Sequence, residues 1–173
     1  MPPRDGDRDR ASRFRPSPIA LKSLALAAAV VVLDQVSKWW ILAVVMQPPK
    51  AIRVAPFFNL VMGWNRGVSF GLFNSDSPVN VWLLPLVVVA VTAALVAWLW
   101  RAERPWLGIG LGLVIGGAVG NLVDRLRFGA VADFLDFHAF GWHWPAFNVA
   151  DSAITVGAAI ILLESLFTRE KKP

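Results

Sequence analysis

The stretch Leu107–Arg125, with the sequence LGIGLGLVIGGAVGNLVDR, contains the two patterns that decide the fold. Its apolar part, 107–123, is nearly long enough to cross a membrane as a helix at about 1.5 Å per residue. Asp124 continues a series in which glycine recurs at every fourth position, at Gly108, Gly112, Gly116 and Gly120. Small residues at this spacing form a helix face that another backbone can approach closely. We expect this face to pack against a neighbouring span; the alternative is a groove that admits a substrate segment.

Three further apolar stretches of similar length lie at 24–45, 79–100 and 149–167. With 56% hydrophobic residues and a mean hydropathy of +0.55, the chain does not have the composition of an ordinary soluble domain. Tryptophans stand near the ends of these stretches, as interfacial anchors do. We therefore predict an all-α polytopic membrane protein with four transmembrane helices.

The charges at the two ends of the chain indicate its orientation. The segment 1–18 is rich in Arg, Asp and Pro, and we predict a disordered cytoplasmic tail there. Residues 19–168 form a single membrane-embedded domain, and 169–173 a second cytoplasmic tail. Eleven of the 17 Lys and Arg residues fall on the side of the membrane that holds both termini, so the positive-inside rule places both in the cytoplasm.

Five aspartates lie in or against the apolar segments: Asp34, Asp124, Asp133, Asp136 and Asp151. A carboxylate at membrane depth costs several kcal/mol or more, so such acids indicate a functional site. Counting about 1.5 Å per residue from the helix ends brings the polar groups of three spans to one level near the outer surface. Two carboxyls close together there can share one proton and act as an acid/base pair. The chain is predicted to be a membrane enzyme.

Structural duties compete with catalytic ones for several of these residues. Asp34 and Lys38 are spaced i,i+4 and can form an ion pair within one helix. Asp124 is expected to stay ionised and to pair with one of two arginines that follow it closely in the sequence, Arg125 or Arg127. Asn148 can cap the fourth helix, with Asp151 three residues later in a capping-box relation.

Two segments between the spans are predicted to cover the site on the outer side. Residues 51–73 alternate in polarity and predict a small curved hairpin, with its turn at Asn65–Gly67. The segment Asp133–Phe147 mixes acids with Phe and Trp and is expected to lie in the plane of the membrane interface.

Several other functions are disfavoured by what the chain contains. It has no Cys and two His, which argues against a metal centre. The net charge of +5 comes from residues at the ends of apolar runs, which fits membrane topology and not nucleic-acid binding. A proton-coupled transporter is the main alternative, but it requires acids strung through the membrane depth. A Ser/Lys protease is disfavoured because Ser37 and Lys38 point about 100° apart on a helix.

Five short motifs, in order along the chain, resemble those of lipoprotein signal peptidases (signal peptidase II), the bacterial aspartic proteases that cut prolipoproteins. The motifs are DQVSK at 34–38, NRGVSF at 65–70, GGAVGNLVDR at 116–125, VADF at 131–134 and FNVADS at 147–152. The resemblance covers nearly the whole chain after about Leu24.

The resemblance implies a fold, a reaction and a set of site residues. The fold is a four-helix bundle with a periplasmic β-cradle and a short periplasmic interfacial helix. The catalytic dyad falls at Asp133 and Asp151. Matching positions that shape the site or hold substrate are Asp34, Lys38, Asn65, Gly120, Asn121, Asp124, Arg125 and Asn148.

The implied enzyme lies in the bacterial inner membrane with its site at the periplasmic face. It releases the signal peptide on the amino side of a cysteine that carries diacylglycerol. Its partners would be lipidated prolipoproteins and membrane lipids, with no nucleic acid. It needs no metal or other cofactor, and the cyclic peptide globomycin would inhibit it.

Overall fold

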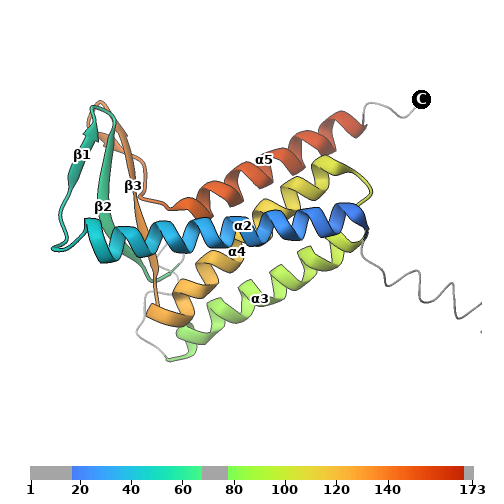
Figure 1. The fold of residues 1–173 in the computed structure, drawn as a ribbon, viewed down its shortest axis with the longest axis horizontal. Coiled ribbons are helices and arrows are strands. Elements are labelled where there is room, and N and C mark those ends of the chain that lie inside the picture. The colour runs from blue at the N-terminus through green and yellow to red at the C-terminus, as the bar shows by residue number, and fades with distance from the viewer. Residues whose placement is uncertain (1–16, 68–77, 170–173) are drawn as a thin grey trace, which may run out of the picture.

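The computed structural model describes residues 17–67 and 78–169. Four long helices lie side by side, and a small sheet stands across one end of them (Figure 1). The helices are α2 (Pro18–Trp40), which continues as the π-helical segment η1 (Ile41–Val45), α3 (Pro78–Trp100), α4 (Pro105–Phe128) and α5 (Val149–Arg169). The start of α2, the α3–α4 connection and the end of α5 all lie at the end far from the sheet (Figure 1).

The four predicted spans are confirmed, since the described residues contain four helices long and apolar enough to cross a membrane. All four helices are longer than predicted, α3 and α5 by one or two residues and the other two by more. Helix α2 begins at Pro18, behind an N-cap at Ser17 whose Oγ accepts from the Ala20 amide at 3.1 Å. Helix α4 continues through Asp124 to Phe128, because it is closed by Gly129 and does not stop where the continuous apolar run stops, at Val123. Gly129 has φ 69°, the left-handed conformation that closes many helices.

Helix α4 is the central element of the bundle, and its glycine face packs against α2. A Cβ atom at Gly112 would lie 2.6 Å from Ser23 O, and one at Gly116 would lie 2.7 Å from Ala27 O. Real side chains do not reach such distances, so glycine permits this approach of the two backbones. The packing interpretation of the glycine series is confirmed, and the alternative of a substrate groove on this face is wrong.

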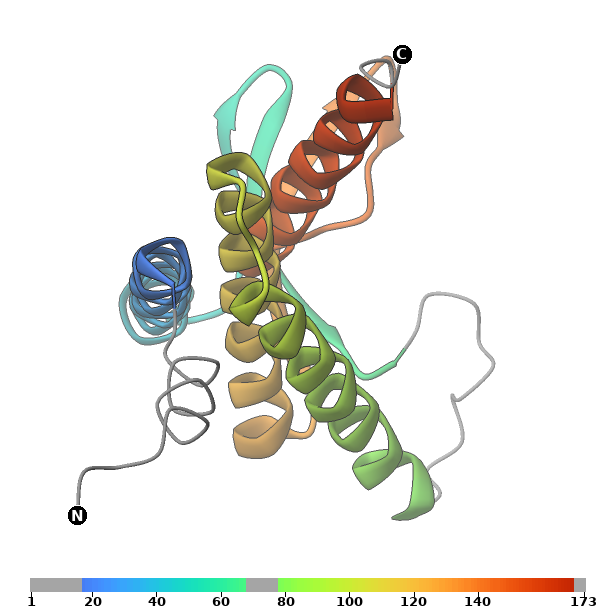
Figure 2. The same cartoon turned by 90° about the vertical axis from the view of Figure 1, so that its right-hand side faces the viewer.

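A second glycine face of α4 packs against α5. A Cβ at Gly110 would lie 2.9 Å from Gly157 O, and one at Gly157 would lie 2.6 Å from Gly110 O. Helix α4 is therefore held between two neighbours at close range, with α3 running beside it (Figure 2). In the most apolar 18-residue stretch of α4, 50% of the residues are buried inside the protein, against 11% in the corresponding stretch of α5.

The sheet is antiparallel, with the strand order β1-β2-β3-β4. The strands are β1 (Ile52–Ala55), β2 (Phe58–Asn65), β3 (Val131–Ala139) and β4 (Trp142–His143). The first three run across the direction of the helices (Figure 1). A cluster of buried apolar side chains, formed by Ile41, Met46 and Phe134, fixes the sheet to the end of α2.

A hairpin lies within the predicted segment, but the prediction that it turns at Asn65–Gly67 is wrong. The strands β1 and β2 meet at Pro56–Phe57, with Ala55 opposite Phe58. Asn65 is the last residue of β2, and Arg66–Gly67 follows it. Over its length β2 pairs on its other side with β3, so that Phe58 lies opposite Phe137 and Asn65 opposite Val131. The predicted continuation of the hairpin at 68–73 lies outside the described residues.

The aromatic segment Asp133–Phe147 forms strands. Its backbone is used for pairing: the amides of Phe134 and Leu135 donate to Phe147 O at 3.0 and 2.8 Å. The described ranges hold no short helix apart from η1, so the expected interfacial helix is not seen in them. Nearly all of the two predicted tails also lies outside those ranges.

The close helix contacts lead to a prediction that compares two glycines on one face of α4. Replacing Gly112 with Ala should lower the melting temperature in detergent, because its Cβ would meet the Ser23 backbone. Overpacking of this kind costs about 1–3 kcal/mol, more than the gain in helix propensity. Gly108→Ala is the matched control, because its Cβ would meet the side-chain atoms of Ile19 and Ser23, which can move. Equal melting temperatures for the two variants would contradict this account of the packing.

Candidate active site

A lysine buried between two carboxylates lies at the sheet end of the helices. The Lys38 Nζ is 2.8 Å from Asp34 Oδ2, 2.9 Å from Asp124 Oδ2 and 3.1 Å from Asn121 Oδ1. The Lys38 side chain is 3% exposed, and the two acids are 0% and 1% exposed. An ammonium group has three N–H donors, and all three are used here. The predicted ion pair within α2 is confirmed, and it is part of a cluster that joins α2 to α4.

The predicted partner of Asp124 was wrong. Asp124 was expected to pair with an arginine beside it in sequence, but the structure pairs it with Lys38, on another helix. The Arg125 Nη1 instead donates to Asn121 O at 3.2 Å, and the Arg127 guanidinium lies over the Phe128 ring. Asp124 lies on the face of α4 that packs against α2, so its carboxylate meets Lys38 on that helix. Proximity in the sequence therefore indicated the wrong partner.

Gln35 is a member of this cluster that sequence reasoning missed. Its Nε2 donates to Asp124 Oδ1 at 3.0 Å and to Gly120 O and Asp34 Oδ2 at 3.2 Å each. It therefore satisfies acceptors from both helices. Its place next to Asp34 in the DQVSK motif was the one available signal.

The two acids of the cluster also hold backbone amides. Asp34 Oδ1 accepts from the amide of Ala150 at 2.9 Å, and Asp124 Oδ2 accepts from the amide of Ala132 at 3.1 Å. Each amide belongs to the residue directly before one member of the predicted dyad. The Lys38 cluster thus fixes the backbone immediately before Asp133 and before Asp151.

The start of α5 is a reciprocal capping box, as predicted. Asn148 Oδ1 accepts from the Asp151 amide at 2.9 Å, and Asp151 Oδ2 accepts from the Asn148 amide at 3.2 Å. Together with the bond from Ala150 to Asp34, these contacts satisfy donors that the first turn of a helix otherwise leaves unpaired. Asp151 is held in one place by these contacts, and the residue is half-buried.

Two asparagines link the carboxyls of the predicted dyad, Asp133 and Asp151. Asn121 Nδ2 donates to Asp151 Oδ1 at 2.7 Å, and Asn148 Nδ2 donates to Asp133 Oδ1 at 2.7 Å. The two amides are themselves joined, since Asn148 Nδ2 lies 3.2 Å from Asn121 Oδ1. Asn65, at the end of β2, adds a side-chain hydrogen bond to Asp133.

The environment of Asp133 changes its protonation. Burial, and after it the nearby charge of Asp151, raises the pKa of this carboxyl to about 6. The hydrogen bonds from Asn65 and Asn148 and the charge of Lys38 act against that rise in pKa. Burial dominates, so Asp133 holds its proton to a higher pH than an ordinary aspartate does.

The structure brings all the predicted site residues to one place. Gly120 contributes a carbonyl acceptor for Gln35, and a Cβ there would lie 2.6 Å from Asp34 Oδ2. Arg125 is half-buried and interacts electrostatically with Asp151, Asp133 and Asp124. In the described parts of the chain, no three His, Asp or Glu side chains are arranged to hold a metal ion.

Asp136 is separate from this cluster. It lies three residues after Asp133 on β3, which directs the two side chains to opposite faces of the sheet. Its carboxyl accepts from Asn59 Nδ2 at 2.8 Å and contacts His143 Nδ1 at 2.8 Å. The hydrogen bond from Asn59, followed by the contact with His143, holds the pKa of Asp136 below its usual range. Sequence reasoning missed both partners, which come from other strands.

Known proteins resemble the chain over most of its length. The family model described as "Signal peptidase (SPase) II" matches residues 26–167. The lipoprotein signal peptidase of Methylobacterium sp. (strain 4-46) is 48% identical over 149 residues, which cover 86% of this chain and 90% of that protein. That of Caulobacter vibrioides is 45% identical, covering 86% of this chain and 88% of that protein.

A solved structure agrees with these sequence matches. It is described as a bacterial membrane enzyme studied by the in meso method at 2.3 Å resolution, and it superposes on the chain with a TM-score of 0.75. The two are 31% identical, and the match covers 87% of this chain and 92% of the other. At this identity and coverage the likeness extends to the fold as a whole.

The Lys38 cluster predicts which residues are energetically coupled. Asp124→Asn leaves part of the Lys38 charge without its partner, and removing one member of a buried pair costs about 3–5 kcal/mol. Combining Asp124→Asn with Lys38→Met should destabilise less than the sum of the single changes, with a coupling of about 0.5–3 kcal/mol. Melting curves of the four proteins in detergent measure this coupling.

The matched control for this cycle replaces the arginine next in sequence. Asp124→Asn with Arg125→Gln should show a smaller coupling, because Arg125 donates to the Asn121 carbonyl and Asp124 binds Lys38. A larger coupling with Arg125 than with Lys38 would show that the partner of Asp124 has been assigned wrongly.

Proposed function

We propose the function of this chain from the premise that it belongs to the signal peptidase II family. It is a multi-pass membrane peptidase of that family. The proposed reaction removes the signal peptide from prolipoproteins modified with diacylglycerol, by cleavage on the amino side of the lipidated cysteine. The observation that carries this proposal is the pairing of Asp133 and Asp151 through Asn121 and Asn148.

Asp133 and Asp151 are assigned as the acid and the base of an aspartic protease dyad. The raised pKa of Asp133 favours it as the carboxyl that holds the proton. Asp151 accepts hydrogen bonds from Asn121 Nδ2 and the Asn148 amide, which hold its carboxyl in place beside Asp133, and the residue is half-buried.

The reaction then proceeds in two steps. Asp151 takes a proton from water as the water oxygen bonds to the scissile carbonyl carbon, and Asp133 donates its proton to the carbonyl oxygen. The resulting diol collapses: one hydroxyl returns its proton to Asp133, the C–N bond breaks, and the leaving nitrogen takes the proton held by Asp151. Both carboxyls finish in their starting states. Arg125, half-buried beside the dyad, is placed to donate to a substrate carbonyl.

The proposed orientation puts this site at the periplasmic face of the bacterial inner membrane, with both termini in the cytoplasm. The excess of Lys and Arg near the termini supports it. The start of α2 and the end of α5 lie on the side away from the sheet, as this topology requires (Figure 1). A diacylglyceryl group in the outer leaflet would then hold the peptide bond near the dyad and reduce the entropy lost in the reaction.

The alternative of a proton-coupled transporter is not favoured. It requires titratable groups at intervals across the membrane. Among the described residues of the spans, Asp34, Asp124 and Asp151 gather at the sheet end, and Glu164 lies in the last turns of α5, near the opposite end. No series of acids in those residues connects the two ends.

One cleavage assay tests both the substrate and the dyad. Purified protein is incubated with matched lipidated and unlipidated prolipoprotein, and the products are separated on a gel. Cleavage of the lipidated form alone is expected. Asp133→Asn and Asp151→Asn should each abolish it without lowering the melting temperature below that needed for the assay, because an amide cannot cycle a proton.

The matched control is Asp136→Asn, which changes an aspartate on the same strand that points away from the dyad. It should keep most of the activity. Turnover by either dyad variant would show that the dyad is assigned wrongly. Efficient cutting of the unlipidated form would show that the enzyme does not require the diacylglyceryl group on its substrate.

A further inference from the structure

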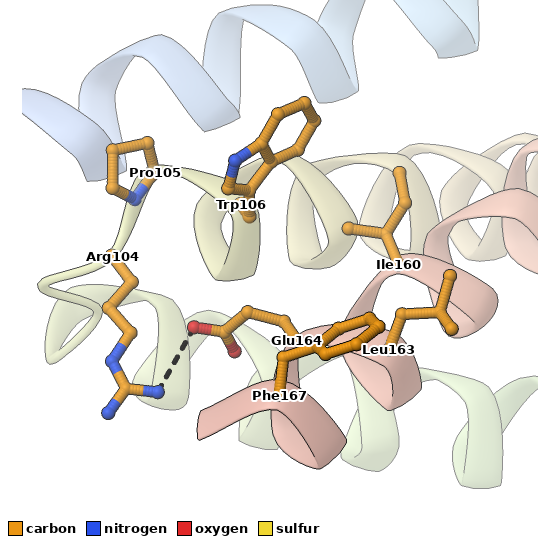
Figure 3. A pocket seen from close by; sticks show the side chains of 7 residues that line it. All are labelled: Arg104, Pro105, Trp106, Ile160, Leu163, Glu164 and Phe167. Atoms are coloured by element: carbon orange, nitrogen blue, oxygen red, sulfur yellow. Dashed lines mark hydrogen bonds and ion pairs between the residues drawn. The ribbon is translucent and has the colours of Figure 1, made fainter. Parts of the chain in front are cut away.

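A groove lies at the end of the bundle opposite the dyad, between the first turn of α4 and the last turns of α5. It has a volume of about 720 Å³, and its lining is mostly apolar: Pro105, Trp106, Ile160, Leu163 and Phe167. Figure 3 shows Arg104 and Glu164 meeting at one end of this groove, with the apolar side chains beyond them. Trp106, Leu163 and Phe167 are between 52% and 68% exposed on helices that span the membrane. The groove therefore faces lipid.

The polar end of the groove presents a guanidinium group. Arg104 Nη1 lies 3.1 Å from Glu164 Oε1. The carboxylate side chain is 15% exposed, whereas the arginine side chain is 53% exposed. A guanidinium is a planar fork suited to phosphate, and the exposed side of Arg104 can contact an anion while Arg104 stays beside Glu164.

The chain segments that adjoin the helix ends at this end of the bundle are basic in sequence. The segments 1–22, 101–106 and 164–173 together contain eleven Lys and Arg residues and six Asp and Glu residues, an excess of five positive charges. The first turn of α4 adds to this potential, because it contains no acidic residue and its N-cap, Arg104, makes no side-chain capping bond.

We propose that this groove binds one anionic phospholipid of the leaflet opposite the dyad. The phosphate would lie at the exposed edge of Arg104, and an acyl chain would follow Trp106, Leu163 and Phe167. Basic pockets between spans bind anionic headgroups, and Trp side chains favour the headgroup level. The inference rests on the groove and its charge, and it holds whether or not the proposed peptidase reaction is correct.

The test measures lipid binding by the full-length protein in a neutral detergent. Phosphatidylglycerol and phosphatidylcholine with identical acyl chains are titrated, and bound lipid is counted by native mass spectrometry alongside the melting temperature. Phosphatidylglycerol should bind about tenfold more tightly and raise the melting temperature, since a charged hydrogen bond is worth about one factor of ten or more. Equal binding of the two lipids would overturn the proposal.

Two arginines of the same connection form a matched pair for this test. Arg104→Gln should remove the preference for phosphatidylglycerol, whereas Arg101→Gln, which removes the same charge outside the groove lining, should retain it. An equal loss in the two variants would show a general attraction to the basic end and would overturn a specific site.

Glu164→Gln gives a change in the opposite direction. It removes the carboxylate that competes with a phosphate for Arg104, so phosphatidylglycerol should bind more tightly than it does to the unmodified protein. Weaker binding would contradict the assigned position of the phosphate. Inorganic phosphate should give no comparable rise in melting temperature, and a rise equal to that with phosphatidylglycerol would identify a free-anion site and overturn the lipid assignment.

Discussion

The positions of Asp133 and Asp151, the proposed dyad, depend on one buried ammonium group. Lys38 Nζ is held by two carboxylates and an amide oxygen, at distances of 2.8 to 3.1 Å, in a place that water hardly reaches. A charge there is tolerable because every donor has a partner, and removing one partner would cost several kcal/mol. The carboxylates Asp34 and Asp124 each bind one further amide, and these amides precede Asp151 and Asp133. One cation thereby fixes two backbone positions that are 18 residues apart in sequence.

Glycine makes this arrangement sterically possible. The Asp34 carboxylate occupies the space where a side chain at Gly120 would lie, since a Cβ there would be 2.6 Å from Asp34 Oδ2. The same close approach continues along the helices at Gly112 and Gly116. The glycine series and the acids thus serve one purpose: the glycines bring the backbones of α2 and α4 together, and the acids bind across the narrow gap.

Much of the helical fold could be predicted from the sequence, because hydropathy and the glycine period act within one segment. The four spans and the capping box of Asn148 and Asp151 are examples. The end of α4 was harder to predict, because Gly129 closes that helix at Phe128, five residues after the continuous apolar run stops at Val123.

Contacts between distant segments could not be predicted in the same way. Lys38, the partner of Asp124, lies 86 positions earlier in the chain. From the sequence alone, the adjacent Arg125 was an equally suitable partner. The hairpin turn at Pro56–Phe57 has a weaker local signal than Asn65–Gly67, and β3 shows no apolar–polar alternation because both of its faces are largely buried. The roles of Asp133 and Asp151 were suggested by the resemblance of the motifs. Their shared asparagines became visible only in three dimensions.

The central claim is that Asp133 and Asp151 form one electrostatically coupled pair. The most direct test is the titration of the Asp133 carboxyl by carbon-13 NMR, in the unmodified protein and in Asp151→Asn. The account predicts a pKa of about 6 in the unmodified protein and a lower pKa in the variant, because the Coulomb repulsion from Asp151 is removed while burial remains. A titration of Asp133 that is unchanged by Asp151→Asn would contradict the pairing.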